Sequence, residues 1–176
     1  MAIQLKKNNK QESKLYNKIL SFSRNKLFYT TLNLEDSFQN RIYLIFLHTS
    51  FIFIKSEISD KKTQNNEFNQ RLFDFIFTKI DDNMREIGYG DTIVNKNMKF
   101  LIKNFYNILL NCENYNKKSF DDKNLFLNKY LTTNCNKNNN NNKDLVGYFD
   151  KYQSFCLDLT RDKVLKGELN FNNMNI

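Results

Sequence analysis

The stretch that decides the fold covers residues 67–116 and reads EFNQRLFDFIFTKIDDNMREIGYGDTIVNKNMKFLIKNFYNILLNCENYN. In its first part, 67–86, apolar side chains recur every three or four residues, which is the spacing of one helix face. Gly88 and Gly90 then interrupt the pattern, because glycine weakens helices and suits the turn that ends one. A second apolar stripe follows in 96–116. Two consecutive helices are therefore predicted.

Two more helices are predicted before this stretch. Residues 13–25 repeat apolar groups at helical spacing. Residues 35–58, with Phe38 on their main apolar face, are apolar around so much of the helix that a central position is expected. Asn33 is expected to cap the second of these helices, and Asn95 the helix at 96–116. The longest apolar run, 42–54, would form a helix of roughly 20 Å, too short for a bilayer core of about 30 Å.

The rest of the chain is expected to alternate polar loops with shorter helices. A polar loop is predicted at 59–66, helices at 120–132 and 144–159, and a short helical stretch within 160–169. The chain has no proline and only four glycines, a composition that favours long helices. We predict an all-α, single-domain bundle of about six to seven helices.

Four segments are expected along the chain. They are a basic N-terminal segment with a short helix at 1–27, a core domain at 28–133, an Asn-rich loop at 134–143, and a C-terminal helix packed on the core with a frayed end at 144–176. Residues 1–34 carry seven basic groups and one acidic group. Such a segment suits anionic lipid or ribosomal RNA, or serves as a solubilising tail, and the sequence leaves these alternatives open.

Few residues offer metal or nucleophile chemistry. His48 is the single histidine and lies within an apolar helix, so a buried, hydrogen-bonded side chain is favoured over a haem or metal ligand. Cys112, Cys135 and Cys156 are an odd number of widely spaced cysteines, which matches neither a disulfide framework nor a zinc motif. A reducing compartment is the simplest interpretation, and no visible signal peptide precedes the domain.

One carboxylate pair lies on a predicted helix. Asp82 and Glu86 are four residues apart and so share a face, with Arg85 and Asp81 beside them. A pair of this kind suits general acid–base catalysis, but a solvated face with local ion pairs is favoured. No enzyme activity, cofactor, metal or small-molecule substrate is expected.

Two blocks of sequence stand out. The first, 28–41, reads FYTTLNLEDSFQNR and leads into a Leu-His pair, and the second, 84–91, reads MREIGYGD and continues through VNKNMK at 94–99. In order and spacing the two blocks resemble the ubiquinol–cytochrome c chaperone family. The resemblance covers about residues 28–116. Glycine is common in the family at the positions of Asn33, Asn40 and Asn107, and proline is usual at that of Glu35. At the first two of these positions Asn tolerates left-handed or capping backbone.

The resemblance implies a function as well as a fold. Family members are all-α assembly chaperones that bind newly made cytochrome b while haem is inserted and the bc1 complex assembles. They are not known as enzymes, and mitochondrial members work with a small co-chaperone near the ribosome. The N-terminal segment has few Arg and Ser residues, and family-like sequence begins by about Phe28, which leaves little to cleave as a transit peptide. A bacterial cytoplasmic protein at the inner face of the inner membrane is therefore expected, with the mitochondrial matrix as the alternative location. The competing function is a ribosome- or RNA-associated factor that uses the basic N-terminal segment.

The partner-binding site is expected at the turn after the 67–86 helix. Because this turn holds the most family-specific motif, we predict that Tyr89, Asp91 and Thr92 contact a partner, with Arg85 beside them. A phosphate-binding loop is disfavoured, because the glycines follow a helix and lack the fuller pattern. A turn that only caps the helix remains the alternative.

Arg41 is the remaining predicted partner-binding residue. Arg41 and Arg85 occupy matching family positions. Either they pair with buried acids such as Asp36 or Asp91, which would be a structural role, or they reach a client. The second apolar face of the 67–86 helix, which carries Phe73 and Phe77, is a candidate client surface. The predicted core residues are Phe46, Phe75, Ile76, Ile80, Leu101 and Phe105.

Overall fold

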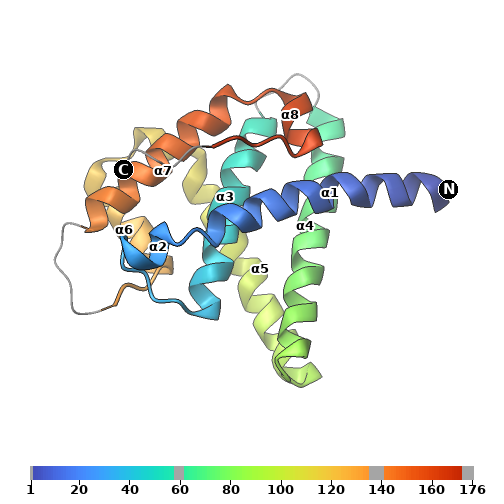
Figure 1. Ribbon diagram of the computed structural model, residues 1–176, viewed down its shortest axis with the longest axis horizontal. Helices are drawn as coiled ribbons and strands as arrows, with labels where there is room; N and C mark the ends of the chain where they lie inside the picture. Colours follow the sequence, from blue (N-terminus) through green and yellow to red (C-terminus); the bar gives the residue numbers. More distant parts are fainter. Residues whose placement is uncertain (1, 58–61, 135–140, 172–176) are drawn as a thin grey trace.

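The computed structural model describes residues 2–57, 62–134 and 141–171, and these form helices joined by short connections (Figure 1). The all-α, single-domain prediction is confirmed. In chain order the elements are α1 (Ala2–Ser23), α2 (Leu27–Thr30), α3 (Phe38–Glu57), α4 (Lys62–Glu86), α5 (Asp91–Glu113), the 3-10 helix η1 (Tyr115–Lys117), α6 (Phe120–Tyr130), α7 (Asn141–Asp158) and α8 (Arg161–Lys166).

Helix α3 is the centre of the fold. It packs against α1, α4, α5 and α7, and every residue from Ile42 to Phe53 is buried. In Figure 1, α1 crosses in front of α3 and α4, and its N-terminal half extends beyond the bundle. Helices α4 and α5 run down together to a turn at one tip of the molecule. The central position expected for an all-round apolar helix is therefore confirmed.

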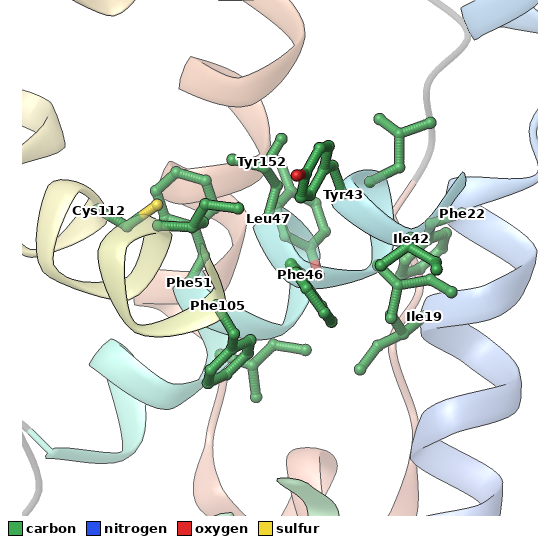
Figure 2. Packing of buried hydrophobic residues seen from close by; sticks show 14 of the residues in the cluster. Ile19, Phe22, Ile42, Tyr43, Phe46, Leu47, Phe51, Phe105, Cys112 and Tyr152 are labelled. Atoms are coloured by element: carbon green, nitrogen blue, oxygen red, sulfur yellow. The ribbon is translucent and has the colours of Figure 1, made fainter. Parts of the chain in front are cut away.

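The core is rich in aromatic contacts. Figure 2 shows Phe46 in the middle of the labelled cluster, with Phe105 of α5 on one side and Ile19 of α1 on the other. The Phe46 ring stacks on Phe77 at 5.4 Å between centroids and meets Phe105 edge-on at 5.3 Å. Such ring pairs add to the stabilisation from burial alone.

Five of the six predicted core residues are buried, namely Phe46, Ile76, Ile80, Leu101 and Phe105. The prediction for Phe75 is wrong, because this side chain is only partly buried and packs at the edge of the core. It meets Tyr16 of α1 edge-on, at 5.5 Å between ring centroids.

Several helix boundaries differ from the prediction. Helix α1 begins at Ala2 and α4 at Lys62, both well before the predicted starts, because polar residues without glycine or proline do not interrupt a helix. Helix α5 begins at Asp91, with Gly90 as its N-cap, so Asn95 lies inside the helix and does not cap it. The negative charge of Asp91 in the first turn complements the helix dipole.

The predicted cap of α3 is also wrong. The helix begins at Phe38, and Asn33 instead adopts left-handed backbone with φ of 55°. Asn tolerates this conformation better than other non-glycine residues, as its side chain is short and polar. Ser37 accepts a hydrogen bond from the backbone N–H of Asn40, at 3.3 Å, and so takes the capping role.

Asn40 has a role that its sequence position did not suggest. Its backbone is helical rather than left-handed, and its buried side-chain amide joins the segment before α3 to the segment after α6. The amide Nδ2 donates to the carbonyls of Glu35 and Thr132 at 2.7 and 2.8 Å, and the Thr132 N–H donates to Oδ1 at 2.9 Å. A single antiparallel bridge between Leu34 and Thr133 continues this contact. The amide therefore satisfies three backbone groups at once.

The C-terminal part follows the prediction with small shifts. Helix α6 starts after Ser119, whose hydroxyl accepts from the Asp122 N–H at 3.2 Å, and α7 and α8 fall within the predicted helical stretches to within a few residues. Most of the predicted Asn-rich loop, Cys135, the predicted end of α3 at Ile58 and the last five residues lie outside the described residues. The division of the chain into four segments stays a prediction.

Candidate functional site

The turn between α4 and α5 ends α4 with a specific hydrogen-bond pattern. The N–H of Tyr89 donates to the carbonyl of Met84 at 3.0 Å, and the N–H of Gly88 donates to the carbonyl of Arg85 at 2.9 Å. Gly88 has φ of +100°, a conformation that glycine adopts without the strain of a side chain. These features define a Schellman motif, so the predicted capping turn is present.

Arg85 holds the two ends of this turn together. Its guanidinium donates to the carboxylate of Asp81 one helical turn earlier, at 2.7 Å, and to the carboxylate of Asp91 at the start of α5. These hydrogen bonds raise the pKa of Arg85 above its ordinary value, Asp81 being the larger cause. Asp91 remains 79% exposed, so it is not the buried acid that the sequence allowed as a partner of Arg85. Exposed pairs of this kind contribute little to stability.

The turn exposes apolar side chains beside these charges. Tyr89 and Thr92 lie on the surface, as do Ile87 and Ile93, and Ile87 is 61% exposed. Large apolar side chains that remain accessible next to an ion pair have the composition of a protein-contact surface, so this turn remains a candidate partner-binding site.

A groove opens next to this turn, between α1, the start of α3 and the end of α4. Its volume is about 210 Å³. The residues that line it are Tyr16, Leu20, Ser23, Arg24, Phe38, Arg41, Ile42, Ile45, Ile80, Asn83, Glu86 and Ile87. The groove is smaller than the roughly 300–1,000 Å³ of sites for drug-sized ligands or cofactors. Its size suits one or two apolar side chains of a partner.

Arg41 stands at the rim of the groove and is held by a bidentate pair with Asp36. The Nε and Nη2 atoms of Arg41 donate to Oδ1 and Oδ2 of Asp36 at 2.7 and 2.9 Å. This hydrogen bonding lowers the pKa of Asp36 and raises that of Arg41. Both side chains are about half exposed, so Asp36 is not a buried acid either, and the planar guanidinium is fixed in orientation at an accessible position.

The groove contains one of the five predicted partner-binding residues. Arg41 lines it, beside Glu86 and Ile87, whereas Arg85, Tyr89, Asp91 and Thr92 do not. Arg85 and Asp91 are brought together separately, by their ion pair at the turn. Sequence reasoning missed Ile87, although it lies inside the family-specific motif.

Phe38 was also missed as a surface residue. The sequence assigned it to the apolar face of α3, but it is 36% exposed because it is the first residue of the helix. The signal that points to its exposure is its place directly after the capping residue Ser37, at the start of the helix, where the chain has not yet entered the core.

The second face of α4, which was predicted as a candidate client surface, packs inside the bundle instead. Phe77 is buried against Phe46, and Phe73 is partly buried among Phe77, Phe105 and Tyr106 at 4.4 to 5.8 Å between centroids. Helix α5 covers this face, so it is an internal contact of the bundle.

His48 is buried and fully hydrogen-bonded, as expected. Nδ1 lies 2.6 Å from the carbonyl oxygen of Leu44, so it carries the proton and donates, and Nε2 accepts from the hydroxyl of Tyr148 at 2.7 Å. Burial lowers the pKa of His48 to about 4. Both ring nitrogens are engaged inside the core, which leaves His48 no lone pair for a ligand.

The other candidates for chemistry are dispersed. Asp82 pairs with Lys79 at 3.1 Å, and Glu86 lies at the groove rim, so the two carboxylates do not form a shared acid–base site. Cys112 and Cys156 are buried and unpaired, and burial raises the pKa of the Cys156 thiol to about 12. Within the parts of the chain that the structure describes, no three His, Cys, Asp or Glu side chains gather as a metal site requires.

No helix within residues 2–57, 62–134 and 141–171 combines the length and apolar character needed to cross a membrane.

Fold and groove together define a class of protein, a single-domain helical bundle with a small surface groove bordered by arginines and exposed apolar side chains. The family model described as "Ubiquinol-cytochrome C chaperone" matches residues 30–171, and the chain belongs to that family. The fold is similar to the crystal structure of the Cbp3 homolog from Brucella abortus, with a TM-score of 0.79, 20% sequence identity, and coverage of 98% of this chain and 97% of that chain. A search of curated proteins finds no match.

Proposed function

We propose that this chain is a non-enzymatic assembly factor that binds newly made cytochrome b during assembly of the bc1 complex. The observation that carries the proposal is the family match, which extends over nearly the whole bundle and includes α3, α4 and α5. The family implies a protein client in the assembly of respiratory complex III. Cytochrome b as that client, the inner face of the membrane as the location, and a ribosome or small co-chaperone as further partners belong to the proposal.

The groove supports a mechanism of shielding. A membrane protein that awaits its partner subunits exposes apolar side chains, and covering them lowers the free energy of the unassembled state. Leu20, Ile42, Ile45 and Ile80 provide an apolar floor for one such side chain. The exposed apolar side chain of Ile87 enlarges the contact at the rim.

Charges at the rim orient the client. Arg24, Arg41 and Glu86 stand around the apolar floor and are all exposed. The guanidinium of Arg41 is already fixed by Asp36, so less side-chain entropy is lost when it donates to a carbonyl or carboxylate of the client. The arrangement of an apolar centre and a polar rim is that of protein–protein interfaces.

The turn residues Tyr89, Asp91 and Thr92 extend the same contact along the tip of the molecule. Replacement of Tyr89 and Asp91 together by alanine should reduce capture of cytochrome b while leaving the thermal midpoint nearly unchanged, because both side chains are exposed and the Arg85–Asp91 pair is solvated. If the variant melts early, the turn is structural. If the variant is stable and captures cytochrome b normally, these residues are not part of the site.

A matched pair of variants tests the groove itself. Ile87→Ser removes an apolar side chain from the rim, and Leu125→Ser removes one from α6, where Leu125 is 73% exposed and distant from the groove. Covering the exposed part of Ile87 is worth about 1 kcal/mol, so Ile87→Ser should weaken binding about fivefold. Leu125→Ser should leave binding unchanged. Equal binding by both variants and the wild type would remove the groove from the proposal.

The salt dependence of binding distinguishes the proposed function from the competing RNA-associated function. Binding through phosphates weakens steeply as salt is added, whereas burial of apolar side chains does not. Capture of cytochrome b that persists at high salt supports the groove, and capture lost with added salt favours the basic N-terminal segment.

A further inference from the structure

We propose that the outer face of α5 is a docking surface for an anionic lipid bilayer. This outer face is the exposed side of the helix, and its charged and large apolar members are Lys96, Lys99, Phe100, Lys103, Tyr106 and Leu110. The proposal concerns how the protein reaches a membrane, and it does not depend on which client the groove holds.

The six residues share one side of the helix. Successive residues of an α-helix turn by about 100°, which places all six within roughly 120° of the circumference. The opposite side carries the buried residues Val94, Leu101, Phe105, Ile108 and Cys112, which pack the helix into the core. Helix α5 is therefore fixed in the bundle with its outer face directed away from it.

The outer face combines positive charge with exposed apolar surface. Phe100 is 56% exposed and Leu110 is 61% exposed, and the three lysines surround Phe100 along the helix. Exposed apolar groups of this size on a surface helix mark a contact with another molecule. A helix that presents lysines together with aromatic and aliphatic side chains has the composition of one that lies in the headgroup region of a membrane.

No ion pair among the described residues neutralises the charge on this face. Residues 92–112 contain three lysines and no acid, and the acids at the ends of α5 are Asp91 and Glu113. Asp91 is engaged by Arg85. Among the described residues, the ion pairs join other side chains, and none involves Lys96, Lys99 or Lys103. An anionic partner is therefore complementary to this face.

The apolar members of the face favour a bilayer over a nucleic acid. RNA-binding surfaces use aromatic rings and arginine planes that stack on bases, and an aliphatic side chain such as Leu110 has no such role. The headgroup–acyl boundary accepts aliphatic and aromatic side chains alike, while long lysine side chains reach the phosphates.

The chain offers a direct spectroscopic probe, because it contains no tryptophan. In the full-length protein, Phe100→Trp places a single tryptophan in the middle of the outer face. Its emission should shift to the blue when vesicles containing phosphatidylglycerol are added, and should not shift with vesicles of phosphatidylcholine alone. An unchanged spectrum with the anionic vesicles would overturn the proposal.

Charge-matched variants locate the binding. Lys96→Gln, Lys99→Gln and Lys103→Gln together should weaken vesicle binding roughly 100-fold, since each lysine near an anionic surface contributes about a factor of five. The control triple, Lys26→Gln, Lys163→Gln and Lys166→Gln, removes the same charge from exposed positions on α8 and before α2 and should bind as the wild type.

The same variants separate this proposal from its rivals. Equal loss with both triple variants would mean non-specific attraction by net charge, and would overturn the docking surface. If the α5 triple variant lost RNA binding but kept vesicle binding, the face would belong to RNA. Client capture is measured in detergent, without vesicles. A lack of vesicle binding therefore does not bear on the proposed function, and a lack of cytochrome b capture does not bear on the docking surface.

Discussion

The buried imidazole of His48 predicts a specific dependence of stability on pH. In the unfolded chain a histidine takes up a proton near pH 6.5, whereas the pKa of His48 in the folded protein is lowered to about 4 by burial. Between these values the unfolded state holds one more proton than the folded state, so the free energy of unfolding falls as the pH falls. The stabilisation is fully present above pH 6.5 and is lost progressively down to about pH 4.

The size of this stability loss follows from the uptake of one proton on unfolding. The slope approaches about 1.4 kcal/mol per pH unit, which gives a loss of about 2 kcal/mol between pH 7 and pH 5. His48 is the only histidine of the chain, and ordinary carboxyl groups titrate below this window. The effect in this range therefore belongs to a single side chain.

Urea unfolding followed by circular dichroism, at pH 7, 6 and 5, measures this dependence. The wild type should lose stability as calculated, and His48→Gln should be less stable at pH 7 but nearly independent of pH over the same range. Tyr148→Phe is the control, because it removes the donor to Nε2 yet keeps the buried imidazole, so the slope should remain. A wild type whose stability does not change between pH 7 and pH 5, or a His48→Gln variant with the wild-type slope, would show that His48 does not cause the pH dependence.

Two further predictions concern the backbone around the site. Asn40→Leu should lower the free energy of unfolding by about 2–3 kcal/mol, because it leaves buried backbone groups without their amide partner. Urea unfolding measures this loss, and a loss below about 0.5 kcal/mol would contradict the bridging role of Asn40. Gly88→Ala should lower it by about 1–2 kcal/mol, because φ is +100° there, whereas Gly90→Ala should be nearly neutral, because Gly90 has φ of −70°. Similar losses for the two glycine variants would show that the conformation of Gly88 is not under strain.

Most of the fold could be predicted from the spacing of apolar residues. The pattern in 42–53 indicated a helix buried on all sides, and α3 is that helix. Helix ends were predicted less well. A polar stretch such as 62–66 has no apolar periodicity that indicates a helix, and it is helical because it contains no residue that interrupts one. The end of α4 was an exception, because Gly88 marks a turn that few other residues tolerate.

The candidate site could be predicted only in part. The motif at 84–91 indicated the turn, but no local pattern shows that Arg41, far away in sequence, borders the same groove as Ile87. The exposure of Leu110 could not be predicted either, because an apolar residue on a helix is expected in the core until the packing of its neighbours is known. Asn40 illustrates the same limit, since its partners lie at Glu35 and, across the fold, at Thr132.

The central claim is that the chain binds newly made cytochrome b. The most direct measurement is a pulse–chase experiment in the cells that make the protein, in which tagged chain is recovered after brief labelling of new proteins and solubilisation in mild detergent. Labelled cytochrome b should be recovered with the chain at early times and should pass into the bc1 complex during the chase. Ile87→Ser should reduce the early fraction, and Leu125→Ser should not. Assembly of the bc1 complex at a normal rate without any labelled cytochrome b on the chain would contradict the claim.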